Sequence, residues 1–152
     1  GDPGLLAEML VKRPAQKKYK IGFVPHYVDR VHPSSVAFAA IDGVHLINVF
    51  DEPCEVLRQI AACEFIVSSS LHGLVIADAY GVPNVRVRLS LGLIDELKFD
   101  DYYSAFGLRA PECLSADELK FLAGEFELFG EGYCRPGLSD IQDDLIKKFP
   151  EI

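Results

Sequence analysis

Apolar segments of strand length alternate with helical segments from Tyr19 to Leu89, and few folds accommodate this pattern. The strand-like segments are rich in Val, Ile and Phe, and they cover residues 19–25, 44–50, 64–68 and 84–89. The first three are apolar along most of their length, as expected for strands that are buried on both faces. The sequence therefore predicts an α/β fold in which a parallel sheet lies between two layers of helices.

Helical periodicity or helix-capping patterns mark six further segments, namely residues 5–11, 34–41, 52–63, 71–80, 115–128 and 139–149. Asp2 and Pro3 fit a cap and first-turn pair for the first of these helices, although Asp2 could instead approach a cleft. Ser34 or Ser35 is expected to cap the second helix. Ser115 begins a Ser-Ala-Asp-Glu capping-box pattern before the fifth.

Composition narrows the possible functions. The 152 residues suit one domain, and 15 Lys and Arg against 23 Asp and Glu give a net charge of −8, which argues against nucleic-acid binding. No apolar run reaches the ~18 residues of a membrane-spanning helix. The four cysteines form no C-x-x-C pair, so we expect reduced thiols, most of them buried, in a cytoplasmic protein.

The chain opens with Gly-Asp-Pro-Gly and has no initiator Met. We therefore expect it to be one domain of a longer protein, the N-terminal domain of which is missing.

The strongest candidate site is the junction of Ser68, Ser69, Ser70, Leu71, His72 and Gly73. A strand ends there and a helix begins, so free N–H groups and the helix dipole favour an anion. His72 adds a titratable group, and Gly73 allows a ligand or another backbone to come close. The alternative is a plain helix cap beside a surface histidine. A Ser/His hydrolase is disfavoured, because Ser70 and His72 are two residues apart and no G-x-S-x-G motif is present.

Further candidates follow the other strands. Arg86 and Arg88 are two apart on the fourth strand and should share a face. Lys98, in Lys-Phe-Asp-Asp-Tyr-Tyr, should reach the same sheet edge and could pair with a phosphate or carboxylate, unless the segment is only a solvated charge cluster. His26 follows the first strand and is a candidate polar contact to substrate, with a surface-loop histidine as the alternative. The spacing of His26, Asp29, His32 and His45 matches no metal signature, so no metal is expected.

Four segments give the chain a resemblance to the polysaccharide pyruvyl transferase family. They are Gly-Asp-Pro-Gly-Leu-Leu-Ala (1–7), Ile-Gly-Phe-Val-Pro-His-Tyr (21–27), Ser-Ser-Leu-His-Gly-Leu-Val-Ile-Ala-Asp-Ala-Tyr-Gly-Val-Pro (69–83) and Lys-Phe-Asp-Asp-Tyr-Tyr (98–103). The third is the most specific.

The resemblance implies transfer of a pyruvyl group from phosphoenolpyruvate to a sugar of an exopolysaccharide or cell-surface glycan, forming a ketal without a cofactor. It implies a Rossmann-like domain similar to the C-terminal, donor-binding half of the B-type glycosyltransferase fold. His72 would be the catalytic acid or a phosphoenolpyruvate contact, and Lys98 would match a family lysine. Several members have Arg where this chain has Ser70, so the carboxylate contact would pass to Arg86 or Arg88.

Three functions remain open. One is the pyruvyl transferase, which would contact the inner membrane peripherally if its saccharide acceptor is lipid-linked. The second is a domain that binds a nucleotide-sugar donor at the same helix start. The third is a non-catalytic ligand-binding homologue.

Overall fold

In a computed structural model that describes residues 1–149, five parallel strands form one sheet in the order β2-β1-β3-β4-β5. Their bounds are β1 Tyr19–Val24, β2 Val44–Leu46, β3 Cys63–Ser68, β4 Asn84–Arg88 and β5 Leu114–Ser115. All four pairings are parallel, so the carboxyl ends of the strands meet along one edge. The predicted α/β fold with a parallel sheet is confirmed.

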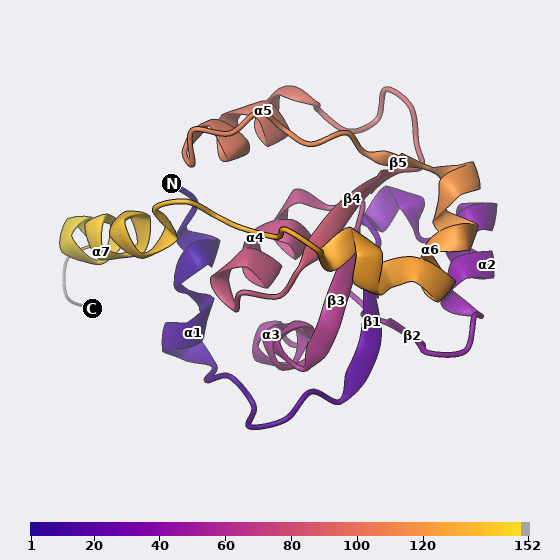
Figure 1. Cartoon of the computed structure of the whole chain (residues 1–152), viewed down its shortest axis with the longest axis horizontal. Helices are drawn as coiled ribbons and strands as arrows, with labels where there is room; N and C mark the ends of the chain where they lie inside the picture. Colours follow the sequence, from indigo (N-terminus) through magenta and orange to yellow (C-terminus); the bar gives the residue numbers. More distant parts are fainter. Residues whose placement is uncertain (150–152) are drawn as a thin grey trace.

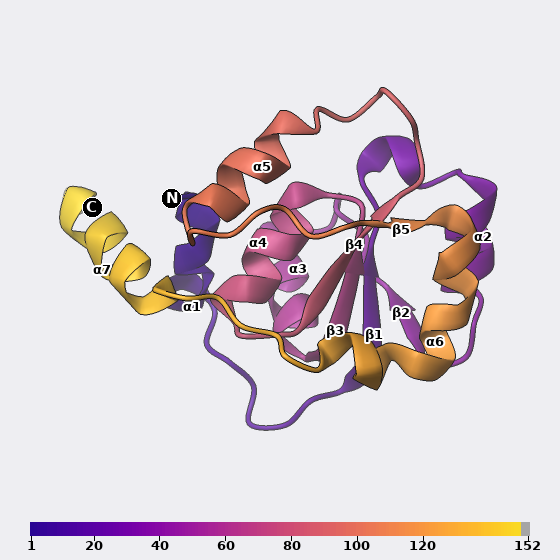
Figure 2. The same cartoon turned by 45° about the horizontal axis from the view of Figure 1, so that its top comes forward.

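The helices are a 3₁₀ turn η1 (Pro3–Leu6), α1 (Ala7–Leu10), η2 (Tyr27–Asp29), α2 (Pro33–Ala39), α3 (Pro53–Ala61), α4 (Leu71–Ala79), α5 (Leu97–Ser104), α6 (Ala116–Gly130) and α7 (Leu138–Lys148). Helices α1, α3 and α4 cover one face of the sheet, and α2 and α6 cover the other (Figures 1 and 2). This is a Rossmann-like three-layer arrangement. None of the helices within residues 1–149 combines the length and hydrophobicity needed to cross a membrane.

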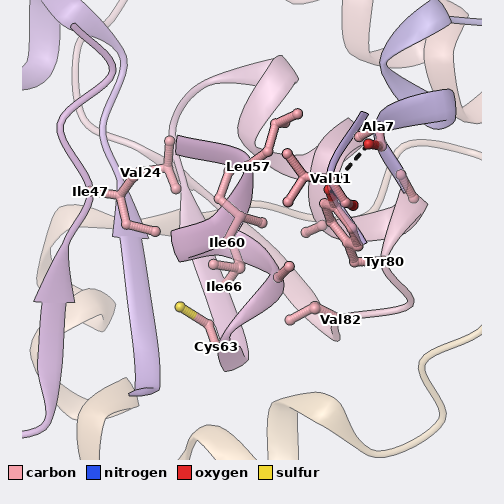
Figure 3. Packing of buried hydrophobic residues seen from close by; sticks show 13 residues of the cluster. Ala7, Val11, Val24, Ile47, Leu57, Ile60, Cys63, Ile66, Tyr80 and Val82 are labelled. Carbon is pink, nitrogen blue, oxygen red and sulfur yellow. Dashed lines mark hydrogen bonds between the residues drawn. The ribbon is translucent and has the colours of Figure 1, made fainter. Parts of the chain in front are cut away.

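Two apolar clusters hold the layers together. On the α1, α3 and α4 side, Ile60 of α3 and Val82 belong to one cluster with Ile66 of β3. Figure 3 shows this cluster, which also includes Tyr80. The Tyr80 hydroxyl reaches the carbonyl oxygens of Ala7 and Val11, at 3.2 and 2.7 Å, and so fixes α1 against α4. Burial raises the pKa of Tyr80 to about 12, which keeps this hydroxyl protonated as a donor.

A third cluster joins parts of the chain that are far apart in sequence. Leu5, Leu74 and Phe99 bring η1, α4 and α5 together, and Leu138, Ile141 and Leu145 of α7 pack against them. The Nε2 of Gln142 also donates to the carbonyl oxygen of Leu5 over 2.8 Å. Consequently α7 and the N-terminal segment lie side by side (Figure 1).

Several predicted boundaries need correction. The strand expected over residues 44–50 ends at Leu46, because the side chain of Asn48 accepts the N–H of Phe50 and starts a turn. As an edge strand, β2 is also only partly buried, not covered on both faces. Helix α2 is capped by the ring of His32, which accepts the Ser34 N–H, so neither Ser34 nor Ser35 is the cap.

Elements α5 and β5 were not predicted, although α5 carries a sequence signal. Phe99, Tyr102, Tyr103 and Phe106 follow the i, i+3, i+4, i+7 spacing of an apolar helix face, and all four are buried. Lys98 directly before Phe99, and Asp100 and Asp101 directly after it, made the segment resemble a charge cluster. In contrast, the capping box at Ser115 and Glu118 is confirmed.

Candidate functional site

The β3–α4 junction is stabilised from within. The Ser68 hydroxyl donates to the Val24 carbonyl over 2.7 Å and accepts the Ser70 N–H over 3.0 Å. The Ser69 hydroxyl accepts the backbone N–H of His26 over 2.9 Å. Both Ser68 and Ser69 are fully buried, so their hydroxyls join the ends of β1 and β3 and hold the loop in shape. A direct contact of either serine with substrate stays a prediction.

Gly73 brings α4 close to the sheet. A Cβ at this position would collide with the Ser68 hydroxyl and lie 3.1 Å from the Cβ of Val24. The glycine predicted to permit close approach therefore accommodates the protein's own side chains, those of Ser68 and Val24. The helix start is placed directly on the carboxyl ends of β1 and β3.

The amino end of α4 has donors to offer. Ser70 is the N-cap, but its side chain makes no capping hydrogen bond, and it is only half-buried. A helix start without a side-chain cap leaves first-turn N–H groups for solvent or a ligand. Together with the helix dipole, these groups favour an anion.

His72 lies at this helix start and points to solvent, with 74% of its side chain exposed. Its Nε2 is 3.8 Å from Oδ2 of Asp2, while Oδ1 of Asp2 accepts the Gly4 N–H over 2.7 Å. Asp2 thus does what both sequence readings proposed, since it caps η1 and also approaches the candidate site. The Asp2 carboxylate therefore lies beside the His72 ring.

A hollow of about 440 Å³ opens beside His72, between α3 and α4. Ser70, His72 and Asp51 provide its polar groups, whereas most of the lining is aliphatic, including Val24, Val49 and Ile76. Asp51 was missed in the sequence, although it follows β2 and the carboxyl ends of all parallel strands meet at this edge. The hollow is mostly apolar with a few convergent polar groups, a common character for small-molecule sites.

His26 lies beside the junction, and Lys98 lies near His26. Nδ1 of His26 accepts the Val28 N–H over 3.3 Å, and the ring is half-buried. Burial and then the charge of nearby Lys98 lower the pKa of His26, so its ring is neutral at pH 7. Lys98 is near enough to act electrostatically on this edge, as predicted from its place after β4.

Arg86 and Arg88 share a face of β4, as predicted, and both bind Glu96. Nη2 of Arg86 lies 2.7 Å from Oε1 and Nη2 of Arg88 lies 3.0 Å from Oε2 of that carboxylate. Arg86 is 7% exposed and stacks on Phe99, with 3.5 Å between its Cζ and the ring centroid. Nothing in the sequence spacing indicated the role of Glu96.

The remaining two histidines, His32 and His45, make contacts elsewhere in the fold. His32 caps α2, and His45 stacks on Tyr19 near a larger hollow of about 810 Å³ at the opposite sheet edge, which contains none of the predicted site residues. Because helix starts and strand carboxyl ends lie at the other edge, the hollow beside His72 is the better candidate for a ligand site. Within residues 1–149, no three His, Cys, Asp or Glu side chains form a group that could hold a metal.

The cysteines are all free, but only Cys63 is buried, which corrects the expectation that most would be. Its Sγ lies 3.1 Å from the Gln59 carbonyl oxygen, and burial raises its pKa to about 12. Cys134 is exposed, while Cys54 and Cys113 are half-buried. Cys63 is therefore a packing residue at neutral pH.

Comparison with known proteins places these features in a family. The model of the polysaccharide pyruvyl transferase family matches residues 3–90, which include β1 to β4 and the whole β3–α4 junction. No solved structure matches the chain significantly.

Two curated relatives are similar over about 70% of the chain. An uncharacterized protein, L143, of Acanthamoeba polyphaga mimivirus is 34% identical over 114 residues, which are 71% of this chain and 40% of the relative. The succinoglycan biosynthesis protein ExoV of Rhizobium meliloti is 32% identical over 108 residues, or 70% of this chain and 34% of ExoV. The chain thus spans less than half the length of either relative.

Proposed function

This chain belongs to the polysaccharide pyruvyl transferase family, and on that premise we propose that it binds phosphoenolpyruvate and helps transfer its pyruvyl group to a sugar, forming a ketal. The observation that carries the proposal is the position of His72. Its exposed ring lies in the first turn of α4, beside uncapped N–H groups and at the mouth of the hollow. A proton donor and an anion site therefore occupy the same place.

The chemistry requires that combination. Protonation of the methylene carbon by His72 leaves the enol carbon electrophilic, and sugar hydroxyls can then attack it. After the first hydroxyl has added, the bond to phosphate breaks and the carbon becomes electrophilic again, so that the second hydroxyl can bond to it. The two hydroxyl protons go to His72 and to the departing phosphate, which restores the imidazolium. General acid catalysis of this kind contributes about 10²–10⁴ in rate.

Charged groups at the sheet edge have complementary roles in this proposal. The α4 start would bind the phosphate, with Lys98 close by as a second positive charge. Asp2 would orient the His72 ring. Arg86 and Arg88 would take the carboxylate. Every bond is made or broken by these protein groups and the two substrates, so the scheme contains no cofactor.

The acceptor site is proposed to lie largely outside this chain. The family implies a saccharide acceptor, and both relatives are much longer than the matched region. We propose that a further, N-terminal domain contributes acceptor contacts across the carboxyl edge, and that the protein works in the cytoplasm. A lipid-linked acceptor would bring it to the inner membrane surface.

Replacing His72 tests the proposal. In the full-length protein, we expect His72→Ala to lower the turnover number for ketal formation by about 10²–10⁴, the range for loss of a general acid. Folding should be unaffected, because the side chain is 74% exposed. Formation of the ketal would be measured by mass spectrometry of the acceptor, alongside the thermal midpoint.

His45→Ala is the matched control, since it removes a histidine from the opposite sheet edge. It should keep normal turnover. Normal turnover in His72→Ala would contradict the catalytic assignment.

A further inference from the structure

The Glu96 carboxylate bridges two arginines, with one oxygen on each. Oε1 accepts from Arg86 over 2.7 Å and Oε2 accepts from Arg88 over 3.0 Å. The hydrogen bond from Arg86 is the main reason that the pKa of Glu96 is lowered. A planar carboxylate between two guanidinium groups is also how proteins commonly bind carboxylate ligands.

The Arg86 guanidinium has a hydrogen-bond donor that is not used within residues 1–149. The side chain is only 7% exposed. The Nε atom is buried, yet it has no hydrogen-bond partner within residues 1–149. A buried charged group with an unsatisfied hydrogen-bond donor is energetically costly. The Phe99 ring, 3.5 Å from Cζ, holds the guanidinium in place. The buried guanidinium is therefore preorganised and incompletely used.

The arginines lie next to the candidate site. Arg86 pairs with Ser68 in the β3–β4 register, one strand from the α4 start. Both arginines line a hollow of about 480 Å³ with Glu96 and the carboxylates of Asp100 and Glu112. An anion in this hollow would meet repulsion from three carboxylates while Glu96 remains there.

Glu96 lies at the end of a largely exposed connection from β4 to α5. Leu91, Leu93 and Leu97 are 70–80% exposed, whereas Ile94 in the same stretch packs against the third apolar cluster. At its start, the Ser90 hydroxyl donates to the buried carboxylate of Asp29. At its end, the two arginines hold Glu96, which is 46% exposed.

We propose that Glu96 occupies the place of a ligand carboxylate, and that a carboxylate-bearing ligand binds Arg86 and Arg88 by displacing it. The inference rests on the proposed function, in that the carboxylate of phosphoenolpyruvate is the natural ligand group. Glu96 then keeps the arginine pair compensated in the absence of ligand. Because Glu96 must leave before a ligand carboxylate can bind, it weakens the binding of every carboxylate-bearing ligand at this arginine pair.

Glu96→Gln tests the exchange, with pyruvate and phosphoenolpyruvate as probes in isothermal titration calorimetry on the full chain. If Glu96 leaves the arginines free about one-tenth of the time, removing its charge should lower both Kd values about tenfold. Inorganic phosphate, which would bind at α4, should keep its Kd. Because the variant takes its ion-pair partner away from the buried Arg86, its free energy of unfolding is measured in parallel and the titrations are run where it is fully folded.

Glu112→Gln is the matched control, since it removes the same charge from the same hollow without breaking an ion pair to Arg86 or Arg88. Its Kd values should change much less. Equal effects of the two variants, no tightening in Glu96→Gln, or equal tightening of phosphate would each overturn the proposal.

The outcomes separate this inference from the proposed function. Tighter pyruvate binding by Glu96→Gln, without ketal formation by the unmodified protein, would support the arginine site and contradict the pyruvyl transfer. Ketal formation with unchanged Kd values would support the transfer and contradict the role of Glu96.

Discussion

At the scale of single residues, the candidate site depends on atoms that are missing as well as on those present. Gly73 allows α4 to rest on the Ser68 hydroxyl, because any Cβ there would collide with it. The same hydroxyl accepts the Ser70 N–H and so shapes the loop that precedes His72. The lack of a Cβ at Gly73 thus allows the position of both the helix start and the proposed acid, His72.

Gly73→Ala should therefore destabilise the protein. Overpacking of a buried contact costs about 1–3 kcal/mol, and more if α4 has to shift. Denaturant unfolding would measure the loss, and donor binding should weaken with it because the helix start moves. Gly124→Ala is the control: this helical glycine has nothing within 4 Å of the added Cβ and should gain about 0.5–1 kcal/mol. A Gly73→Ala protein as stable as the parent would contradict the close packing.

The sequence indicated where the candidate site residues would lie, but it did not indicate their contacts. His72, Lys98 and His26 were identified because they follow strands of a parallel sheet. The 3.8 Å approach of Asp2 to His72 joins residues 70 positions apart, and no local pattern indicates it. The Glu96 bridge also depends on the path of a loop.

At the scale of elements, a buried carboxylate joins α4 to the C-terminal part of the chain. Asp78 is fully buried and accepts from Tyr102 over 2.6 Å, and from Tyr133 and Arg135 over 2.7 Å each. Burial, reinforced by the charge of Asp78, raises the pKa of both tyrosines, so the phenols remain donors. Asp78 thereby fixes α5, which carries Lys98 and the Phe99 ring beneath Arg86.

Asp78→Asn should lower the free energy of unfolding by about 3–5 kcal/mol, because it leaves the charge of Arg135 buried and unpaired. Arg135 has only 9% of its side chain exposed. Chemical denaturation would measure this change. The control Asp144→Asn removes an exposed partner of Lys147 and should cost less than about 1 kcal/mol. Similar losses in the two variants would mean that the buried network contributes little.

Element types followed from sequence patterns where one principle dominated. Apolar runs predicted β1 and β3, and the capping box predicted the start of α6. The pattern failed at α5, where charges between the aromatic residues concealed an apolar helix face. It also failed at β2, where the side-chain bonds of Asn48 end the strand after Leu46.

At the scale of the whole molecule, ligand binding should appear as stability. A ligand that binds only the folded protein at 100 times its Kd adds about 2.7 kcal/mol. Phosphoenolpyruvate should therefore raise the thermal midpoint of the full chain, and His72→Ala should reduce that rise. A nucleoside diphosphate sugar, the donor in the alternative function, should produce no rise in the same scan. Stabilisation by the nucleotide sugar alone would favour that alternative.

The sequence by itself determined the layered α/β fold, because the period and length of apolar segments decide which elements can form and how they must be buried. It also determined where chemistry would gather, since parallel strands place their carboxyl ends at one edge. The tertiary structure alone decided which charges meet there: Asp2 with His72, Glu96 with two arginines, and Asp78 with the C-terminal segment. These pairings join positions far apart in the chain or across irregular loops, and such positions are set by packing of the whole core.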